Sequence, residues 1–214
     1  MSPNVTANAR GRERDVAASV HAALRDRLAA WVGRPLAQSD FLVGEHGKPR
    51  LAMPGPEFSI AHSGNFGLIG ISAAGPIGVD IEVVRPLRMT QERQKRLIAA
   101  AAEFGPPLCD AESSPERMVL QAWVRLEAIA KATGEGMGSL LTRAGIIGGG
   151  QPASAWPASL PHRHELSVRD LYLGPDLIAA VAMSPSEPGP LVKPWAHDAE
   201  AGPQAAALIA TDTK

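Results

Sequence analysis

Three carboxylates and one ammonium group have a spacing that could bring them together. Asp80 and Glu82 lie two residues apart in a predicted strand, so their side chains face the same side of it. Glu127 and Lys131 lie four residues apart in a predicted helix, one turn from each other. Mg²⁺ prefers oxygen ligands, and a lysine nearby neutralises phosphate charge. Three acids that could converge on a divalent cation, with Lys131 nearby, are the components that a phosphate-transfer site needs.

Each of these pairs also has an ordinary explanation. A strand with acids at alternate positions is often half exposed, with a solvated acidic face. A glutamate and a lysine one helical turn apart can be a plain stabilising pair worth about 0.3–0.5 kcal/mol. The helix around Glu127 is apolar on nearly every side, however, and a buried carboxylate needs a partner or a metal. The residues alone leave both interpretations open.

Lys48 and His62 are two further candidates with open roles. Lys48 lies between Gly47 and Pro49, where it is either a cation on a stiff loop or a plain surface lysine. His62 lies at the end of a predicted strand, before Ser63 and Gly64, where a histidine serves as a capping residue or as a ligand.

The composition restricts the class of protein. The chain has 214 residues, with 21 Lys+Arg and 22 Asp+Glu, so no bulk charge indicates nucleic acid or a membrane surface. No apolar run reaches the roughly 18 residues of a membrane span, and Met1–Arg14 lacks the apolar core of a signal peptide. A single cysteine, Cys109, excludes an internal disulfide and suits a reducing compartment. We expect a cytoplasmic protein that binds neither nucleic acid nor membrane.

The elements that must position these residues follow from periodicity and turn signals. Residues 15–32 have an apolar stripe at helical spacing, and Arg27 falls in the middle of it while Arg25 points away. Arg27 therefore needs an anion, unless it extends to the surface or pairs with a carboxylate in the core. A second helix begins at Ser114-Pro115 and ends at Gly134 or Gly136. Five strands are predicted at residues 58–62, 66–72, 77–84, 165–173 and 176–184.

This order of elements predicts an α+β fold of two small halves rather than a parallel βαβ sheet. We place the boundaries at residues 1–84 for the first half, which includes the strand of the acids, and 85–184 for the second, which includes the helix of Glu127. Repeated prolines interrupt every pattern after Ser184, so residues 185–214 are expected to form a disordered tail. Two halves in one chain favour a monomer.

The ordered motifs resemble those of the 4′-phosphopantetheinyl transferases, in their two-halved, surfactin-synthetase-activating type that serves polyketide and peptide synthases. The similarity covers residues 16–184. Its most specific parts are Gly78-Val79-Asp80-Ile81-Glu82 and the Trp123-x-x-x-Glu127-Ala128-x-x-Lys131 block. The resemblance implies a pseudo-twofold arrangement of similar halves. The implied activity moves 4′-phosphopantetheine from coenzyme A to a serine of an apo carrier protein and releases 3′,5′-ADP.

The resemblance also implies a role for each matching residue. Asp80, Glu82 and Glu127 would hold Mg²⁺ on the coenzyme A diphosphate, Lys131 would bind that diphosphate, and Glu127 could also take the serine proton. Lys48 and Pro49 would line the adenine end. His62 and Ser63 would bind coenzyme A, with His62 at its 3′-phosphate, and Arg27 falls near the arginine that meets the same phosphate in the family.

Two positions depart from the family pattern. Leu126 stands where many relatives have lysine, and Ala61 stands where serine usually precedes the histidine. Leu126 favours an alternative function, a non-catalytic protein that binds coenzyme A or a carrier. A metal-dependent hydrolase of a nucleotide diphosphate is a third hypothesis. A basic cluster follows the acidic strand and either docks an acidic carrier or is a solvated face; it contains Arg85, Arg88, Arg93, Lys95 and Arg96.

Overall fold

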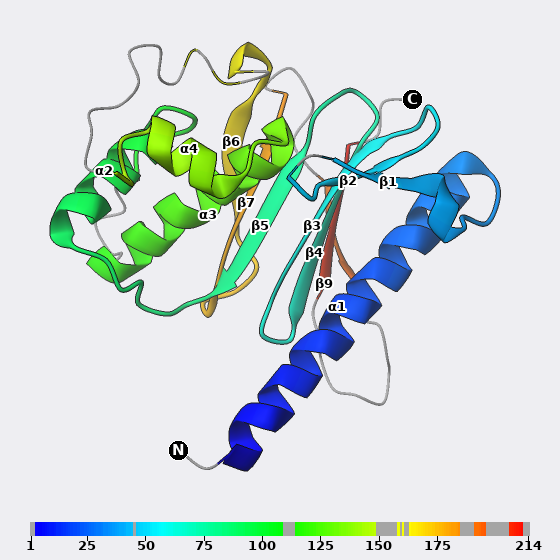
Figure 1. Ribbon diagram of the computed structural model, residues 1–214, viewed down its shortest axis with the longest axis horizontal. Helices are drawn as coiled ribbons and strands as arrows, with labels where there is room; N and C mark the ends of the chain where they lie inside the picture. Colours follow the sequence, from blue (N-terminus) through cyan, green and yellow to red (C-terminus); the bar gives the residue numbers. More distant parts are fainter. Residues whose placement is uncertain are drawn as a thin grey trace.

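The structure is a computed structural model, and it describes residues 3–44, 46–108, 114–148, 158, 160, 163–184, 191–195 and 206–211. The strands in this part of the chain belong to three sheets (Figure 1). The smallest is the antiparallel hairpin β1 (Phe41–Val43) and β2 (Pro49–Leu51). The largest has the order β3 (Glu57–Ser63), β4 (Phe66–Ser72), β9 (Ala206–Thr211), β8 (Leu191–Trp195). The third has the order β5 (Gly78–Val83), β7 (Leu177–Met183), β6 (Ser167–Leu171).

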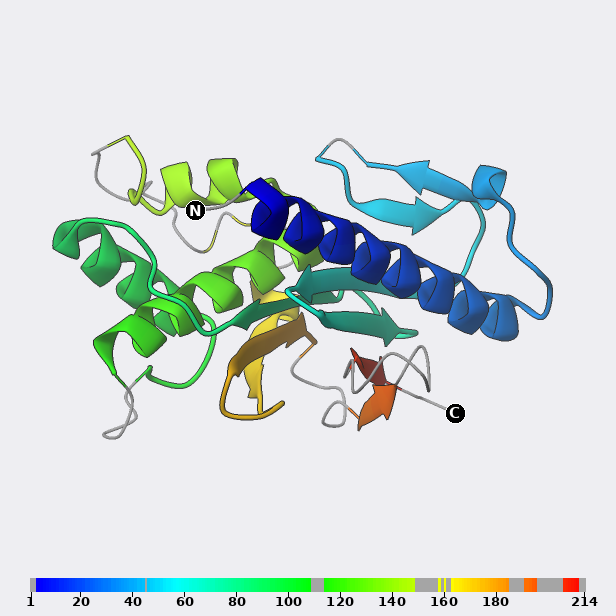
Figure 2. The same cartoon turned by 90° about the horizontal axis from the view of Figure 1, so that it is seen from below.

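The β3–β4 hairpin supports the first half of the molecule. Its turn is tight because Gly64 adopts φ 58°, and Ser63 pairs directly with Phe66. The long helix α1 (Pro3–Val32) lies across β3 and β4, as Figures 1 and 2 both show. Leu24 and Leu28 of α1 are buried in one cluster with Phe58 and Ile69 of the hairpin. The apolar stripe predicted for residues 15–32 is therefore the face that holds α1 on the sheet.

The predicted placement of Arg27 in this stripe was wrong, because its side chain is exposed. The buried residues Val16, Val20, Leu24 and Leu28 follow one another at four-residue steps. Each step of four residues turns the buried face by about 40° on a helix of 3.6 residues per turn. By the third turn the buried face has rotated away from Arg27, so that Arg27 and Arg25 lie on opposite flanks of it.

The second half is built around α3 (Pro115–Thr133). The predicted helix signals are confirmed: Ser114 caps the first turn by accepting the Arg117 amide, Pro115 begins the helix, and Gly134 ends it with φ 72°. α3 packs on the β5–β7–β6 sheet and is covered by α2 (Gln91–Ala102) and α4 (Met137–Arg143). Two short 3₁₀ turns, Gln38–Asp40 and Arg163–Glu165, precede β1 and β6.

The strand β5 and the helix α3 touch backbone to backbone at Gly78. A Cβ atom at position 78 would overlap the carbonyl oxygen of Ala128 and the amide nitrogen of Ala132. The helix contributes two alanines at this contact, and the strand contributes a residue with no side chain. This close approach brings the face of β5 that carries Asp80 against the second half of α3.

The α+β fold class predicted from the sequence is confirmed, and the five predicted strands are present with ends shifted by up to a few residues. β1, β2 and α4 were not predicted, because each is only three to seven residues long. The expectation of a disordered tail was wrong for residues 191–195 and 206–211, which form β8 and β9, with β9 pairing along β4 in parallel. Residues 185–190, 196–205 and 212–214 lie outside the described part.

The boundary between the two halves stays a prediction, and β5 shows why it is hard to draw. β5 precedes residue 84, yet its hydrogen-bonded neighbour is β7 of the second half. Its apolar face packs at the same time toward β3 and β4. No helix in the described part of the chain is both long and apolar enough to cross a membrane.

Replacing Gly78 with alanine should lower the free energy of unfolding by about 1–3 kcal/mol, because the added methyl group forces the β5 and α3 backbones apart. Gly138→Ala is the matched control. An added Cβ there meets nothing within 4 Å, and alanine is the better helix former inside α4. Urea unfolding of the three proteins measures the difference. Equal stability of Gly78→Ala and the wild type would contradict the close contact.

Candidate functional site

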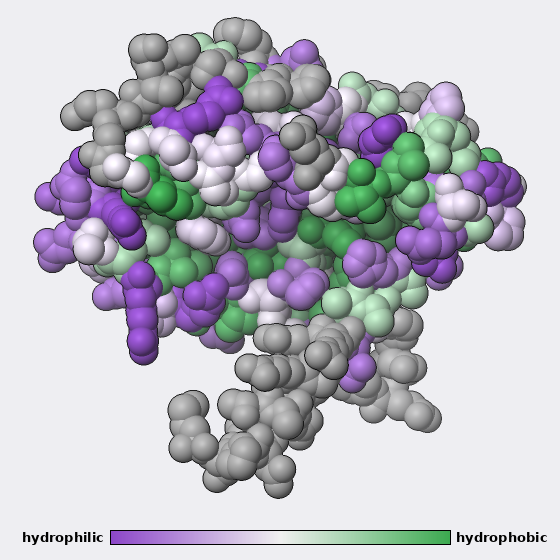
Figure 3. Space-filling view, viewed as in Figure 1, coloured by the Kyte–Doolittle hydropathy of each residue, from purple (hydrophilic) through white to green (hydrophobic). Residues whose placement is uncertain are grey.

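A cavity of about 560 Å³ opens between the two halves of the molecule. Its walls come from α1, from the β1–β2 hairpin, from β3 and from the C-terminal end of α3 with the turn that follows. The lining residues that carry polar side chains are His21, Arg25, Gln38, His46, Lys48, Ser59, Glu127, Lys131 and Glu135. Hydrophobic side chains gather over β1 and β2 at the rim (Figure 3), where Val43 is 73% exposed.

An ion pair between Lys131 of α3 and Asp80 of β5 joins these two elements behind the cavity. The Lys131 ammonium donates a hydrogen bond to Asp80 Oδ1 at 2.7 Å, across the β5–α3 contact. Asp80 is 7% exposed, and burial raises its pKa from 3.8 to about 6; Lys131 opposes the rise, and the charges of Glu127 and Glu82 add to it. Burial likewise raises the pKa of Glu127, with Lys131 opposing and Glu82 adding. The three predicted acids therefore interact with one another through space.

Glu82 meets two donors at the edge of this cluster. Its Oε2 accepts a hydrogen bond from the Ser63 hydroxyl at 2.8 Å, and its Oε1 accepts one from Arg85 at 2.9 Å. The Ser63 oxygen in turn accepts the amide of Val83, so that the end of β3 is fastened to the end of β5. Ser63 thus holds an acid, whereas the sequence predicted it to contact coenzyme A.

The acids fit a hard divalent cation in their chemistry. All the donors are carboxylate oxygens, which Mg²⁺ prefers; burial raises the pKa values of Asp80 and Glu127, and the negative charge of Glu82 adds to both shifts. As the side chains stand, the described residues contain no group of three His, Cys, Asp or Glu arranged to hold a metal. Lys131 and Arg85 each occupy an oxygen that a cation would use.

Lys48 reaches into the interior at the start of β2. Its ammonium lies 3.4 Å from the carbonyl oxygens of Ile77 and Ala132 and 3.5 Å from Glu57. Burial lowers the pKa of Lys48, and the charge of Glu57 opposes that effect. The side chain ties the β1–β2 hairpin to the β5–α3 contact and lines the cavity beside Pro49. The interpretation as a plain surface lysine is excluded by these contacts.

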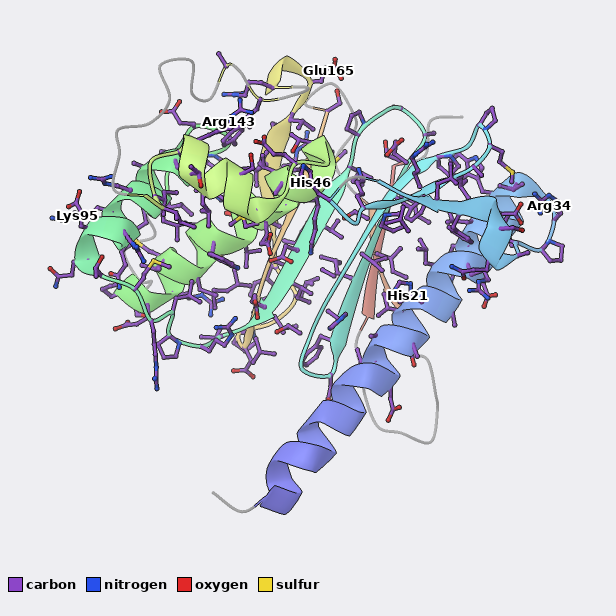
Figure 4. All side chains as sticks on the ribbon, in the orientation of Figure 1. His21, Arg34, His46, Lys95, Arg143 and Glu165 are labelled. Carbon is purple, nitrogen blue, oxygen red and sulfur yellow. The ribbon has the colours of Figure 1, made fainter. Side chains whose placement is uncertain are left out.

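The structure brings His21 and Arg25, rather than Arg27, to the cavity. They lie one turn apart on the flank of α1 that faces the opening, and Figure 4 shows His21 on this helix and His46 next to α4. The sequence prediction missed them because it used a single fixed stripe for a helix whose buried face rotates. His62 is exposed and, like Arg27, is not among the residues that line the cavity.

The two departures in sequence have structural explanations. Leu126 is fully buried among the apolar residues of the second half, so a lysine there would have to leave the core. The preceding Arg125 is 1% exposed, and its Nε donates to Asp170 Oδ1 at 2.8 Å while its Nη1 donates to the Pro106 carbonyl. Arg125 therefore holds α3 on β6 and does not replace the missing cation. Ala61 is buried in the apolar face of the β3–β4 hairpin.

Comparisons with known proteins agree with the resemblance seen in the motifs. No protein-family model matches the chain. Over 118 residues it is 36% identical to slr0495 of Synechocystis sp., a provisionally named 4′-phosphopantetheinyl transferase; the match covers 54% of this chain and 48% of that protein. The 4′-phosphopantetheinyl transferase HetI of Nostoc sp. is 30% identical over 122 residues, which are 55% of this chain and 51% of HetI.

A third relative is the 4′-phosphopantetheinyl transferase AcpT of Salmonella typhi, 32% identical over 119 residues, which are 50% of this chain and 60% of AcpT. The chain spans about half the length of the curated relatives it matches. Over the matched residues the chain is therefore similar to proteins named as 4′-phosphopantetheinyl transferases, which is the superfamily that the motifs predicted.

The buried Asp80 predicts a pH dependence of stability. Because its pKa is higher in the folded protein, the folded state holds a proton between about pH 4 and 6 that the unfolded state has lost. Stability therefore falls as the pH rises through this window, by about 3 kcal/mol at roughly 1.4 kcal/mol per pKa unit. Urea unfolding in EDTA at several pH values should show this loss in the wild type and not in Asp80→Asn. The exposed Asp26→Asn variant should follow the wild type, and a loss retained in Asp80→Asn would contradict the assignment.

Proposed function

We propose that the protein transfers the 4′-phosphopantetheine group of coenzyme A to a serine of an apo carrier protein and releases 3′,5′-ADP. One observation carries this proposal: Lys131, Glu127 and the buried Asp80 come together where the cavity between the halves meets the β5–α3 contact. The relatives named above carry the same activity in their names. Coenzyme A and a carrier protein are thus proposed as the two substrates.

The walls of the cavity suit a ligand with an apolar ring at one end and phosphates at the other. Phe41, Phe58 and Val43 provide apolar surface near Lys48 and Pro49, where we propose that the adenine binds. Arg25 and His21 provide cationic or hydrogen-bonding groups on the α1 side, where we propose that the 3′-phosphate binds. We retain Lys131 as the proposed ligand of the diphosphate. His62 and Arg27 do not line the cavity, so their side chains would need to move to contact coenzyme A there.

The proposed chemistry requires charge neutralisation and a proton acceptor. The serine oxygen forms a bond to the β-phosphorus, the bond from that phosphorus to the bridging oxygen breaks, and 3′,5′-ADP leaves with the bond electrons. Asp80, Glu82 and Glu127 are proposed to hold Mg²⁺, which when bound supplies positive charge to the diphosphate oxygens. Lys131 adds a fixed charge beside them. Glu127 is the proposed acceptor of the serine proton, since it lines the cavity and has a raised pKa.

The basic cluster after β5 is the proposed docking surface for an acidic carrier. Arg88, Arg93 and Lys95 are exposed, and Figure 4 shows Lys95 on the outer side of α2. Arg96 is instead engaged with Glu92 and with the Gly145 carbonyl, so it supports the fold. The cytoplasmic location and the monomeric state stay predictions, as do the absence of nucleic acid and membrane among the partners.

A direct assay tests the proposed reaction against its alternatives. The protein is incubated with Mg²⁺, coenzyme A and an apo carrier domain, and the carrier is weighed by mass spectrometry. We expect a phosphopantetheine increment in the wild type, and a rate at least about 100-fold lower in Asp80→Asn and Glu127→Gln. Asp26→Asn, an exposed acid of α1, should keep the wild-type rate.

The other outcomes identify a different function. An unlabelled carrier together with tight binding of coenzyme A would indicate a non-catalytic binding protein, the alternative that Leu126 favours. Cleavage of coenzyme A without labelling would indicate a hydrolase. Full labelling by Glu127→Gln would refute its proposed role.

Arg25 and Arg27 form a matched pair for testing the placement of the ligand. Arg25→Ala should weaken coenzyme A binding by roughly 1 kcal/mol, about fivefold, because the partly exposed guanidinium faces the cavity. Arg27→Ala removes the same charge from the other flank of α1 and should leave the affinity unchanged. Isothermal titration calorimetry with coenzyme A measures both variants. The reverse order of effects would place the 3′-phosphate where the sequence alone predicted it.

A further inference from the structure

Glu82 differs from the other two acids in having each carboxylate oxygen bound by a separate donor. The Ser63 hydroxyl binds Oε2, and Ser63 is itself fixed by the Val83 amide. The Arg85 guanidinium binds Oε1 at 2.9 Å. Ser63 is neutral and belongs to the rigid end of the β3–β4 hairpin. Arg85 carries a full positive charge, and it follows β5 in a segment without regular structure.

The two ion pairs of the cluster are unequal in their exposure. The Lys131–Asp80 pair is largely buried, with 9% of the Asp80 side chain exposed. The Arg85 side chain is 52% exposed, so it can move into water without losing a buried environment. An ion pair of this kind contributes little net stability, because the solvated guanidinium is a good alternative. Arg85 is therefore the cation of the cluster that leaves most easily.

We propose that Arg85 sets the affinity of the acid cluster for a divalent cation, by holding a Glu82 oxygen in an ion pair that the cation must displace. The inference rests on the proposed metal site of Asp80, Glu82 and Glu127. Arg85 is a positioning residue, because it acts through its ion pair with Glu82.

The physical argument is a competition for one anion. A divalent cation carries twice the charge of a guanidinium and binds a carboxylate oxygen directly. It nevertheless has to pay for the loss of the 2.9 Å contact, and it also feels the repulsion of a positive charge that stays nearby. Removing the guanidinium removes both effects, and both changes favour the cation. The variant is therefore expected to bind metal more tightly than the wild type.

The test measures the binding of Mn²⁺ alone, without substrates, by isothermal titration calorimetry. Arg85→Gln keeps most of the side-chain length and removes the charge, and it should bind Mn²⁺ about three- to fivefold more tightly than the wild type. Arg88→Gln is the matched control. Arg88 is exposed and forms no ion pair within the part of the chain that the structure describes, so its affinity should equal that of the wild type. Thermal unfolding confirms that both variants fold.

The outcomes test two claims separately: the role of Arg85 and the proposed metal site. Equal or weaker Mn²⁺ binding by Arg85→Gln, with normal binding by the wild type, overturns the role of Arg85 and leaves the proposed metal site standing. Tighter binding by both arginine variants shows a general effect of net charge and also overturns it. Mn²⁺ binding that survives Asp80→Asn, or that is absent from the wild type, overturns the proposed metal site and this inference with it.

Discussion

The absence of a side chain at position 78 is the constraint on which the candidate site depends. Gly78 lets the backbone of β5 touch the backbone of α3 at Ala128 and Ala132. Any larger residue would separate the two elements. Since Asp80 lies two residues further along the same strand and Lys131 lies on the facing turns of α3, their 2.7 Å contact requires this approach. The chemistry of the site is therefore a consequence of backbone packing.

Charge is concentrated at this contact although the chain as a whole is nearly neutral. Glu82 and Glu127 interact with the buried Asp80, and two cations, Lys131 and Arg85, form ion pairs with Asp80 and Glu82. Lys48 brings a further, partly buried ammonium from the β1–β2 hairpin to the β5–α3 contact. Burial makes the charges of Asp80, Glu127 and Lys48 costly, whereas Arg85 is half exposed. The proposed ligand, an anionic diphosphate with its cation, carries charge of both signs.

The helix α3 shows how the residues that differ from the family pattern are accommodated. Leu126 packs in the core, and the neighbouring Arg125 is turned by about 100° toward β6, where Asp170 meets its guanidinium. A buried arginine without that carboxylate would be strongly destabilising. The pair fastens one side of α3, and Glu127 and Lys131 line the cavity on another side, where Lys131 also pairs with Asp80.

Much of the fold could be predicted from short-range signals in the sequence, and the elements that were not predicted have a common cause. Ser114, Pro115 and Gly134 determine the ends of α3 through local hydrogen bonds and backbone angles, so they could be recognised without a partner. β1 and β2 are too short to have a periodic pattern. β9 forms by pairing with β4, more than 130 residues earlier in the chain. The local sequence of a proline-rich segment does not indicate such a distant partner.

The sequence by itself determined which residue types are present, their alternation along β5 and their spacing along α3. From these came the prediction of a site with three acids and Lys131, and the resemblance to the 4′-phosphopantetheinyl transferases. The tertiary structure alone decided which flank of α1 faces the cavity, because that depends on how the helix crosses the β3–β4 hairpin. It also decided that Ser63 and Arg85 bind Glu82, and that Arg125 belongs to the core. Contacts between distant segments have no counterpart in local spacing, since they are set by packing.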